Sequence, residues 1–202
     1  MRLHLAIAGF LLTLATGAQA ECECLWQGSF VDVHAQTDLV VVATVVARKG
    51  NSIDLQIDQR LSGSETTPPV RVWLKTGDYC RPPADTFPPG SQWVMALHQI
   101  TQEIPGGFDP FTPNVSFGRQ GDFSLSSCGG YWLSRKEGWV SGNLVDAPRW
   151  EREPKMTPVL LQLVASHVNG ELDANALLKA SREDPALREL ILDTRAFLRK
   201  EN

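Results

Sequence analysis

The sequence predicts a mainly β domain that is followed by an α-helical tail. Residues 39–46 form a continuous apolar run rich in valine, which is typical of a strand buried on both faces. Residues 53–58 alternate strictly between apolar and polar side chains, which indicates a half-exposed strand. A turn at residues 49–52 connects the two, so we expect an antiparallel hairpin. After Thr157 the apolar residues recur at helical spacing instead.

Later segments complete the predicted β region, which ends near Asp146. Residues 70–74 alternate again and predict the third strand, and residues 93–97 predict the fourth; two short apolar pieces, at 128–133 and 139–144, allow a last strand or two. Between residues 105 and 121 the chain is crowded with Gly, Pro and Asn, which suppress regular structure. We therefore expect a long loop there.

The tail predicts three helices. The first is marked by a helical repeat that consists of Val159, Leu160, Leu163, Val164 and His167. The second covers residues 174–180, and the third begins near Pro185, because proline is favoured in the first turn of a helix. Asp173 and Asp184 are the expected N-caps of the second and third helices.

Residues 1–20 have the three parts of a cleavable signal peptide. Arg2 supplies the positive start, residues 3–14 an almost unbroken apolar stretch, and residues 18–20 the small-x-small cleavage site, which would leave Glu21 as the N-terminus. The apolar run is too short to span a bilayer and no comparable run follows it. We therefore expect a periplasmic or secreted protein with no membrane insertion after cleavage. The alternative is a buried N-terminal helix, for which the charge and the cleavage site would be coincidences.

These patterns divide the chain into a signal peptide at 1–20, a β domain at 21–146 and a helical extension at 147–202. About 180 mature residues suit one compact domain with an appendage. The formal net charge is -4, and the Lys and Arg residues are scattered along the chain. A nucleic-acid binder would carry a basic patch, so we expect no nucleic-acid partner.

The cysteines Cys22, Cys24, Cys80 and Cys128 all lie in the mature part. An even number of cysteines in an exported chain predicts two disulfides. Cys22 and Cys24 are too close to pair with each other without strain, so each reaches forward to one of the other two, and both arrangements remain open. A zinc site is the alternative, but a Cys-x-Cys pair with two remote single cysteines lacks the spacing of structural zinc sites. We therefore predict no metal ligands.

The mature chain offers His34, His98 and His167 as bases for nucleophilic catalysis, and none of them lies in a recognisable motif. The sequence contains no nucleophile elbow, zinc-protease motif, phosphate loop or Cys-x-x-Cys redox pair. We therefore predict no catalytic residue and no cofactor. A hydrolase without a recognisable motif is kept as a further hypothesis for function, beside the binding roles that a family resemblance and the helical tail suggest. His34 and His98 are structural residues or metal ligands, and the lack of His-x-His spacing favours a structural role.

Aromatic residues suggest either core packing or a contact surface. Trp73 and Trp93 fall inside predicted strands, where we expect them to be buried, and Trp26 and Trp132 lie near cysteines, where we expect packing over a disulfide. A carbohydrate- or peptide-binding platform is the alternative for the tryptophans. The loop 108–117, which includes Phe111, is either a contact surface or a structural loop.

The order of these features resembles a known family. A cysteine pair follows the signal peptide, and after a Val-rich hairpin come two single cysteines and a Gly-Ser-Gln-Trp strand start; these are Cys22-Glu23-Cys24, Cys80, Gly90-Ser91-Gln92-Trp93 and Cys128. The pattern is similar to the netrin-like module, the OB-fold barrel of the tissue inhibitors of metalloproteinases (TIMPs), in its bacterial exported versions. The resemblance covers residues 22–144 and implies a five-stranded OB-like barrel. It also implies disulfides between Cys22 and Cys80 and between Cys24 and Cys128.

In that family the amino group and carbonyl of the first cysteine chelate the zinc of a protease, and the next residue enters its specificity pocket. The resemblance therefore implies that Cys22 and Glu23 contact a zinc metalloprotease, with Glu21 and Cys24 as neighbouring parts of the partner-binding segment. We predict an exported, non-enzymatic binding module whose specific form is a metalloprotease inhibitor. The alternative is a structural or interaction protein of the cell envelope that docks a partner through its helical tail.

Overall fold

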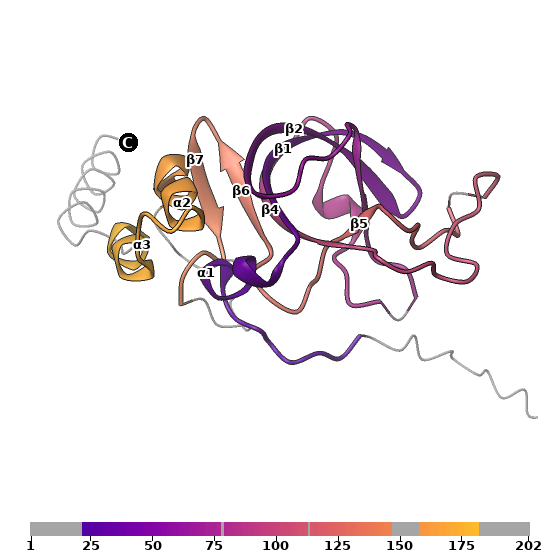
Figure 1. Cartoon of the computed structure of the whole chain (residues 1–202), viewed down its shortest axis with the longest axis horizontal. Coiled ribbons are helices and arrows are strands. Elements are labelled where there is room, and N and C mark those ends of the chain that lie inside the picture. Colours follow the sequence, from indigo (N-terminus) through magenta and orange to yellow (C-terminus); the bar gives the residue numbers. More distant parts are fainter. Residues whose placement is uncertain (1–21, 78, 113, 147–157, 182–202) are drawn as a thin grey trace, which may run out of the picture.

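A computed structural model describes residues 22–77, 79–112, 114–146 and 158–181 (Figure 1). Five strands close into a barrel: β1 (Leu39–Lys49), β2 (Ser52–Gly63), β3 (Val70–Trp73), β4 (Gln92–Gln99) and β5 (Phe123–Ser124). Their order is β1-β2-β3-β5-β4, and β4 pairs with β1 to complete the ring. Strands β3 and β5 are parallel, and the other neighbours in the barrel are antiparallel. This arrangement confirms the predicted mainly β, OB-like fold class.

The hairpin of β1 and β2 forms the longest wall of the barrel. Residues 39–42 of β1 are at most 1 % exposed, as predicted for a strand buried on both faces. Strand β2 reaches Gly63, beyond the predicted end at residue 58, because it stays paired with β1 as far as Leu39. Its register against β1 shifts at three points, and such bulges bend a hairpin strongly enough to coil it into a barrel.

Strand β5 was not predicted. It contains two residues, pairs in parallel with β3 and antiparallel with β4, and follows directly on the Gly- and Pro-rich loop. A strand this short has no alternation that a sequence pattern can reveal. The barrel nevertheless closes through it.

A second, outer set of strands extends the sheet from β4: β6 (Trp132–Lys136), β7 (Trp139–Gly142) and β8 (Val159–Leu160). The first two are the predicted last strands. For Val159 and Leu160 the helical prediction is wrong, because they pair with Val140 and Trp139 of β7. The unpaired edge of β7 offers backbone hydrogen bonds that these two residues take up before the helix begins.

The tail then forms two described helices, α2 (Leu161–Val168) and α3 (Ala174–Ser181). Val164 and Leu177 are 0 % exposed and belong to the same hydrophobic core as the barrel strands. Asp173 accepts a hydrogen bond from the Ala176 amide at 2.9 Å, so its predicted capping role is confirmed. The predicted signal peptide, Glu21, Asp184 and the helix after Pro185 lie outside the described residues.

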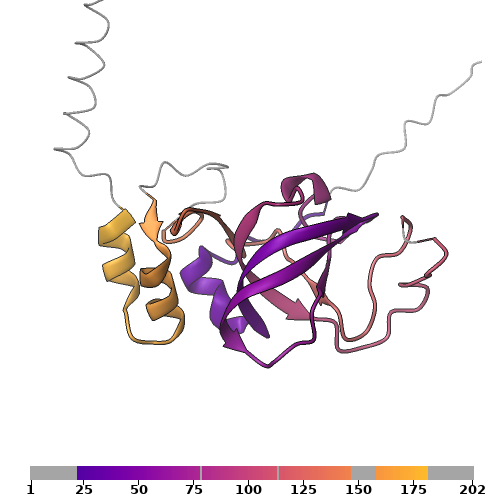
Figure 2. The same ribbon diagram turned by 90° about the horizontal axis from the view of Figure 1, so that it is seen from above.

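The helices and the long loop lie at opposite ends of the barrel. Figure 2 shows α2 and α3 at one end and the loop that precedes β5 at the other. Two 3₁₀ turns, η1 (His34–Gln36) and η2 (Ala84–Thr86), and one short helix, α1 (Phe30–Val33), complete the described elements. None of the described helices has the length and hydrophobicity needed to span a membrane.

A histidine pair joins the barrel to the tail. The rings of His34, in η1, and His167, in α2, have centroids 5.1 Å apart. The Nδ1 atom of each donates to a backbone carbonyl, of Phe30 at 3.1 Å and of Leu172 at 2.8 Å. Burial, with the nearby His167 adding to its effect, lowers the pKa of His34 below its ordinary value, although the hydrogen bond to Phe30 opposes this.

We expect His34 to make stability depend on pH. A histidine whose pKa is lowered by folding contributes its full stability above its unfolded pKa of about 6.5, and that contribution falls as the pH drops below this value. The melting temperature should therefore decline between neutral and mildly acidic pH, and His34→Gln should flatten this decline. His98→Gln, at a different place in the barrel, is the control. An unchanged decline in His34→Gln would contradict the assignment.

Candidate functional site

Two disulfides tie the N-terminal segment to the barrel. Cys22 pairs with Cys80 and Cys24 with Cys128, with Cα–Cα distances of 5.2 and 5.8 Å. These are the pairs that the resemblance implied. All four sulfur atoms lie within 4.8 Å of one another, but disulfide sulfurs are not thiolates and do not serve as zinc ligands in this state.

The residues 22–27 form an extended segment that we call the ridge. Its side chains alternate between half-buried and exposed positions. Cys22, Cys24 and Trp26 therefore face the barrel, whereas Glu23 and Leu25 face outward, and Leu25 is 89 % exposed. The Cys-x-Cys spacing thus places both cysteines on the face that is bonded to the barrel.

Backbone contacts hold the ridge beside the segment that contains Cys128. The Gln27 amide donates to the Cys128 carbonyl at 2.7 Å, and the Gly130 amide donates to the Gly28 carbonyl at 2.9 Å. A Cβ atom at Gly130 would lie 2.5 Å from the Asn143 carbonyl oxygen and 2.6 Å from the Phe30 nitrogen. Glycine is therefore required there, because two neighbouring stretches of backbone approach it closely.

A hollow of about 580 Å³ opens beside the ridge. We call it the ridge hollow; it is lined by Cys22, Lys75, Tyr79, Arg81, Pro82, Pro83, Thr86, Ser127 and Trp132. Tyr79, which is 38 % exposed, also lines a smaller hollow of about 430 Å³ with Thr76, Gly77 and Phe117. Tyr79 therefore borders two concave surfaces, and the ridge borders the larger of these two through Cys22.

Arg81 is the most unusual residue of the ridge hollow. It is 9 % exposed, its guanidinium lies 4.3 Å from the centre of the Tyr79 ring, and Nη1 donates to the Phe117 carbonyl at 2.5 Å. The Tyr79 ring also stacks on Phe117, with centroids 5.6 Å apart. Burial lowers the pKa of Arg81 below its ordinary value. Within the described part of the chain, Arg81 has no carboxylate partner.

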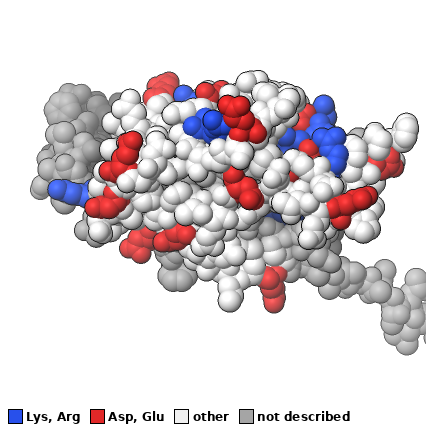
Figure 3. Space-filling view, in the orientation of Figure 1, with Lys and Arg blue, Asp and Glu red and all other residues white. Residues whose placement is uncertain are grey.

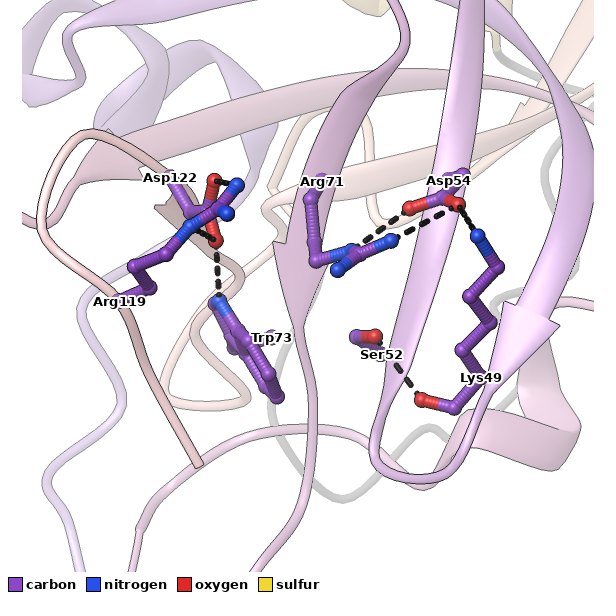
Figure 4. Close-up of polar contacts among 7 residues, drawn as sticks. All are labelled: Lys49, Ser52, Asp54, Arg71, Trp73, Arg119 and Asp122. Carbon is purple, nitrogen blue, oxygen red and sulfur yellow. Dashed lines mark hydrogen bonds and ion pairs between the residues drawn. The ribbon is translucent and has the colours of Figure 1, made fainter. Parts of the chain in front are cut away.

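A second group of charges, on β1, β2 and β3, is paired internally (Figure 4). Arg71 donates to both carboxylate oxygens of Asp54, at 2.8 and 3.1 Å, and Lys49 lies 3.2 Å from the same carboxylate. Burial raises the pKa of Asp54, but Arg71 and Lys49 outweigh it and the net pKa is lowered. These contacts stabilise the barrel wall, since each charge already has its counter-ion.

The same figure shows how the long loop is attached to the barrel. Asp122 accepts a hydrogen bond from the buried Trp73 indole at 2.9 Å and pairs with Arg119 at 2.8 Å. Arg119 and Asp122, with Arg71, line a hollow of about 340 Å³, in which both acidic and basic groups are present. We therefore regard this hollow as less suited to a charged ligand than the ridge hollow.

The structure separates the predicted histidines. His34 and His167 lie together at the junction with the tail, whereas His98 packs against Tyr131 with ring centroids 5.4 Å apart. In the described part of the chain, none of the three rings is hydrogen-bonded to a serine hydroxyl or a carboxylate. These contacts therefore give no geometric support to a hydrolase.

The aromatic predictions have mixed outcomes. Trp73 is 1 % exposed, as predicted, but Trp93 is only partly buried, because it lies at the edge of the core beside Phe87. Trp132 lines the ridge hollow together with the Cys22 disulfide. In the loop 108–117, Phe108 packs on Trp73 whereas Phe111 is 91 % exposed, so the loop has both a structural base and an exposed tip.

Sequence reasoning missed Tyr79 and Arg81. They flank Cys80, the cysteine that bonds the start of the ridge. Their position next to a cysteine was the available signal, because a disulfide brings the neighbours of both its cysteines together. Nothing in the sequence indicates that Arg81 is buried.

We expect removal of the second disulfide to free the ridge while the barrel stays folded. In a variant with Cys24→Ser and Cys128→Ser, the Gln27 amide should exchange hydrogen much faster, because the bond to the Cys128 carbonyl loses its covalent support. The unfolding free energy should fall by roughly 4 to 5 kcal/mol for a cross-link of this span. Native-state hydrogen exchange measures both effects, with the amides of β1 as internal reference.

The variant with Cys22→Ser and Cys80→Ser is the control, since it leaves the link next to Gln27 intact. It should protect the Gln27 amide better than the first variant does. Equal and unchanged protection in both variants would show that the disulfides do not hold the ridge.

The comparisons with known proteins add no relative to this picture. No family model, no curated protein and no solved structure matches the chain. The OB-like barrel is therefore established by its own strand order, and the netrin-like resemblance remains a resemblance in the cysteine order and strand pattern.

Proposed function

We propose that this chain is an exported binding module that engages a protein partner through the ridge. One observation carries the proposal: two disulfides fix the ridge to the barrel, and the ridge still directs Leu25 into solvent with 89 % of its surface exposed. A segment that is already ordered loses little conformational freedom on binding, so its contacts contribute more fully to affinity. Concave surfaces on either side of Tyr79 add places for partner side chains.

Two cross-links support a periplasmic or secreted location. Disulfides form and persist in oxidising compartments and are rare in the cytosol. This agrees with the signal peptide that the sequence predicts at residues 1–20. The export part of the proposal thus has two independent supports, one from the N-terminal pattern and one from the cysteine pairing.

The specific form that we propose is inhibition of a zinc metalloprotease. Its supports are the resemblance to the TIMP module and the place of Cys22, which lines the ridge hollow with its disulfide at the base of the ridge. Chelation of zinc needs a free amino group on Cys22, because a peptide nitrogen is a poor metal ligand. The acting form would therefore begin at Cys22, with Glu21 removed.

Partner docking through the tail has less support. Val164 of α2 and Leu177 of α3 are 0 % exposed against the barrel core. Part of the apolar face of the described helices therefore packs against the barrel core, which leaves less of it for a partner.

Two forms of the mature chain, beginning at Glu21 and at Cys22, test the inhibitor proposal. We expect the Cys22 form to inhibit at least one member of a panel of zinc endoproteases, and the Glu21 form to inhibit far less. Leu25→Asp in the Cys22 form should weaken inhibition by roughly tenfold, the effect of about 1.4 kcal/mol of lost apolar contact. Inhibition constants with a fluorogenic peptide substrate measure these effects.

Leu160→Asp is the matched control, since Leu160 is 42 % exposed and lies on β8, at the end of the chain's outer sheet. It should leave inhibition unchanged. If the Cys22 form inhibits no protease of the panel, the inhibitor proposal is wrong. If both substitutions weaken inhibition equally, the contact surface is not the ridge.

A further inference from the structure

Arg81 differs from every other described arginine. The others each have a carboxylate oxygen within 4 Å: Arg48 with Asp85, Arg60 with Glu65, Arg71 with Asp54, Arg119 with Asp122 and Arg135 with Asp58. Arg81 has no such partner in the described part of the chain, although it is nine-tenths buried. Buried charges are normally paired, because desolvation is otherwise uncompensated. The Arg81 nitrogens that lack a hydrogen-bond partner in the described chain still touch solvent, so they are open to an oxygen ligand that enters the hollow.

The guanidinium is held in place but has hydrogen-bonding capacity to spare. Its single described hydrogen bond goes to the Phe117 carbonyl, and one face lies against the Tyr79 ring. A guanidinium has five N–H donors, which leaves a majority free for a ligand. The planar fork of these donors matches a carboxylate, which it binds through two parallel hydrogen bonds.

The surroundings of Arg81 favour a single negative group. The described lining of the ridge hollow includes a second cation, Lys75, and the hydroxyl groups of Tyr79, Thr86 and Ser127, and none of these described lining residues is acidic. Glu23, on the outward face of the ridge, makes no ion pair with a described residue. Among the described residues, Arg81 and Lys75 thus form no ion pair, in contrast to the paired charges of Figure 4.

The rest of the lining suits the stem of an amino acid side chain. Trp132, Pro82 and Pro83 supply apolar walls, and a volume of about 580 Å³ is far larger than a bare ion needs. A polyanion is a poor candidate, because the net charge of the chain is -4 and acidic and basic residues are interspersed on the face shown in Figure 3.

We propose that the ridge hollow receives an Asp or Glu side chain of the partner polypeptide, bound by the guanidinium of Arg81 with Lys75 as the second cation. This rests on the proposed function, because the acidic side chain belongs to the polypeptide that contacts the ridge. The carboxylate accepts two hydrogen bonds from Arg81, and its aliphatic stem packs against Trp132. Leu25 and the ridge hollow then recognise adjacent residues of the partner, one apolar and one acidic.

The probes for this site are two blocked tripeptides, acetyl-Ala-Glu-Ala-amide and its neutral counterpart acetyl-Ala-Gln-Ala-amide, with sodium acetate as a third probe. They are titrated into the ¹⁵N-labelled mature chain, and the side-chain Nε–Hε signals of the arginines are followed by NMR. We expect a saturable shift of the Arg81 signal with the Glu peptide and none with the Gln peptide. Acetate should bind more weakly than the Glu peptide, because it lacks the stem and the backbone.

Three variants complete the test. Arg81→Met should weaken binding of the Glu peptide on the order of tenfold or more, as expected when one member of a buried charge pair is truncated. Lys75→Met, an exposed substitution that does not threaten folding, should weaken binding by a smaller factor. Lys179→Met removes the same charge on α3, a helix that contributes no described residue to the lining of the ridge hollow, and should have no effect.

The outcomes are distinct from those of the inhibition assay, because no protease takes part. A shift that is absent, equal for the Glu and Gln peptides, or equal for the Glu peptide and acetate would overturn the acidic side-chain site while leaving the ridge proposal intact. If the shift is saturable and specific for the Glu peptide but the chain inhibits no protease, the acidic side-chain site stands and only the inhibitor proposal is wrong. If Arg81→Met does not fold, Lys75→Met and the Glu–Gln comparison still decide the question.

Discussion

Two covalent cross-links hold the ridge against the barrel. Its outward residues Glu23 and Leu25 contribute little burial, and its hydrogen bonds to the barrel are concentrated near Gln27. The cross-links span 58 and 104 residues, so each removes considerable freedom from the unfolded chain, roughly 4 kcal/mol or more in the chain-entropy account. Placed side by side, they fix both the position and the direction of an extended segment. A rigid and exposed edge at one side of a small barrel is the result.

The same cross-links shape the surface beside the ridge. Because Cys22 is bonded to Cys80, the ridge start lies next to Tyr79 and Arg81, and these residues would otherwise belong to an ordinary loop between β3 and β4. Arg81 then becomes buried between the Tyr79 ring and the Phe117 carbonyl. Arg81 differs from the other described arginines, each of which has a carboxylate oxygen within 4 Å. The ridge, with its exposed Leu25, therefore borders the hollow that contains Arg81.

Much of the fold could be predicted because its long strands have regular patterns. The valine run of β1 and the alternation of β2 reflect burial on two faces and on one face, and the even cysteine count reflects an oxidising compartment. The short strands could not be predicted from the sequence. Strand β5 is too brief to show a period, and β8 is a strand only because the edge of β7 lies beside it. The position of the ridge could be predicted from the Cys-x-Cys spacing. The ridge hollow could not, since Arg81 and Trp132 are far apart in the sequence and meet through tertiary contacts alone.

Peptide mapping under non-reducing conditions tests the central claim most directly. Proteolysis of the mature chain with its thiols blocked, followed by mass spectrometry, should yield one linked peptide containing Cys22 and Cys80 and another containing Cys24 and Cys128. Free thiols at these positions, or links between Cys22 and Cys128, would contradict the account, because the ridge would then have a different course or no fixed course across the barrel.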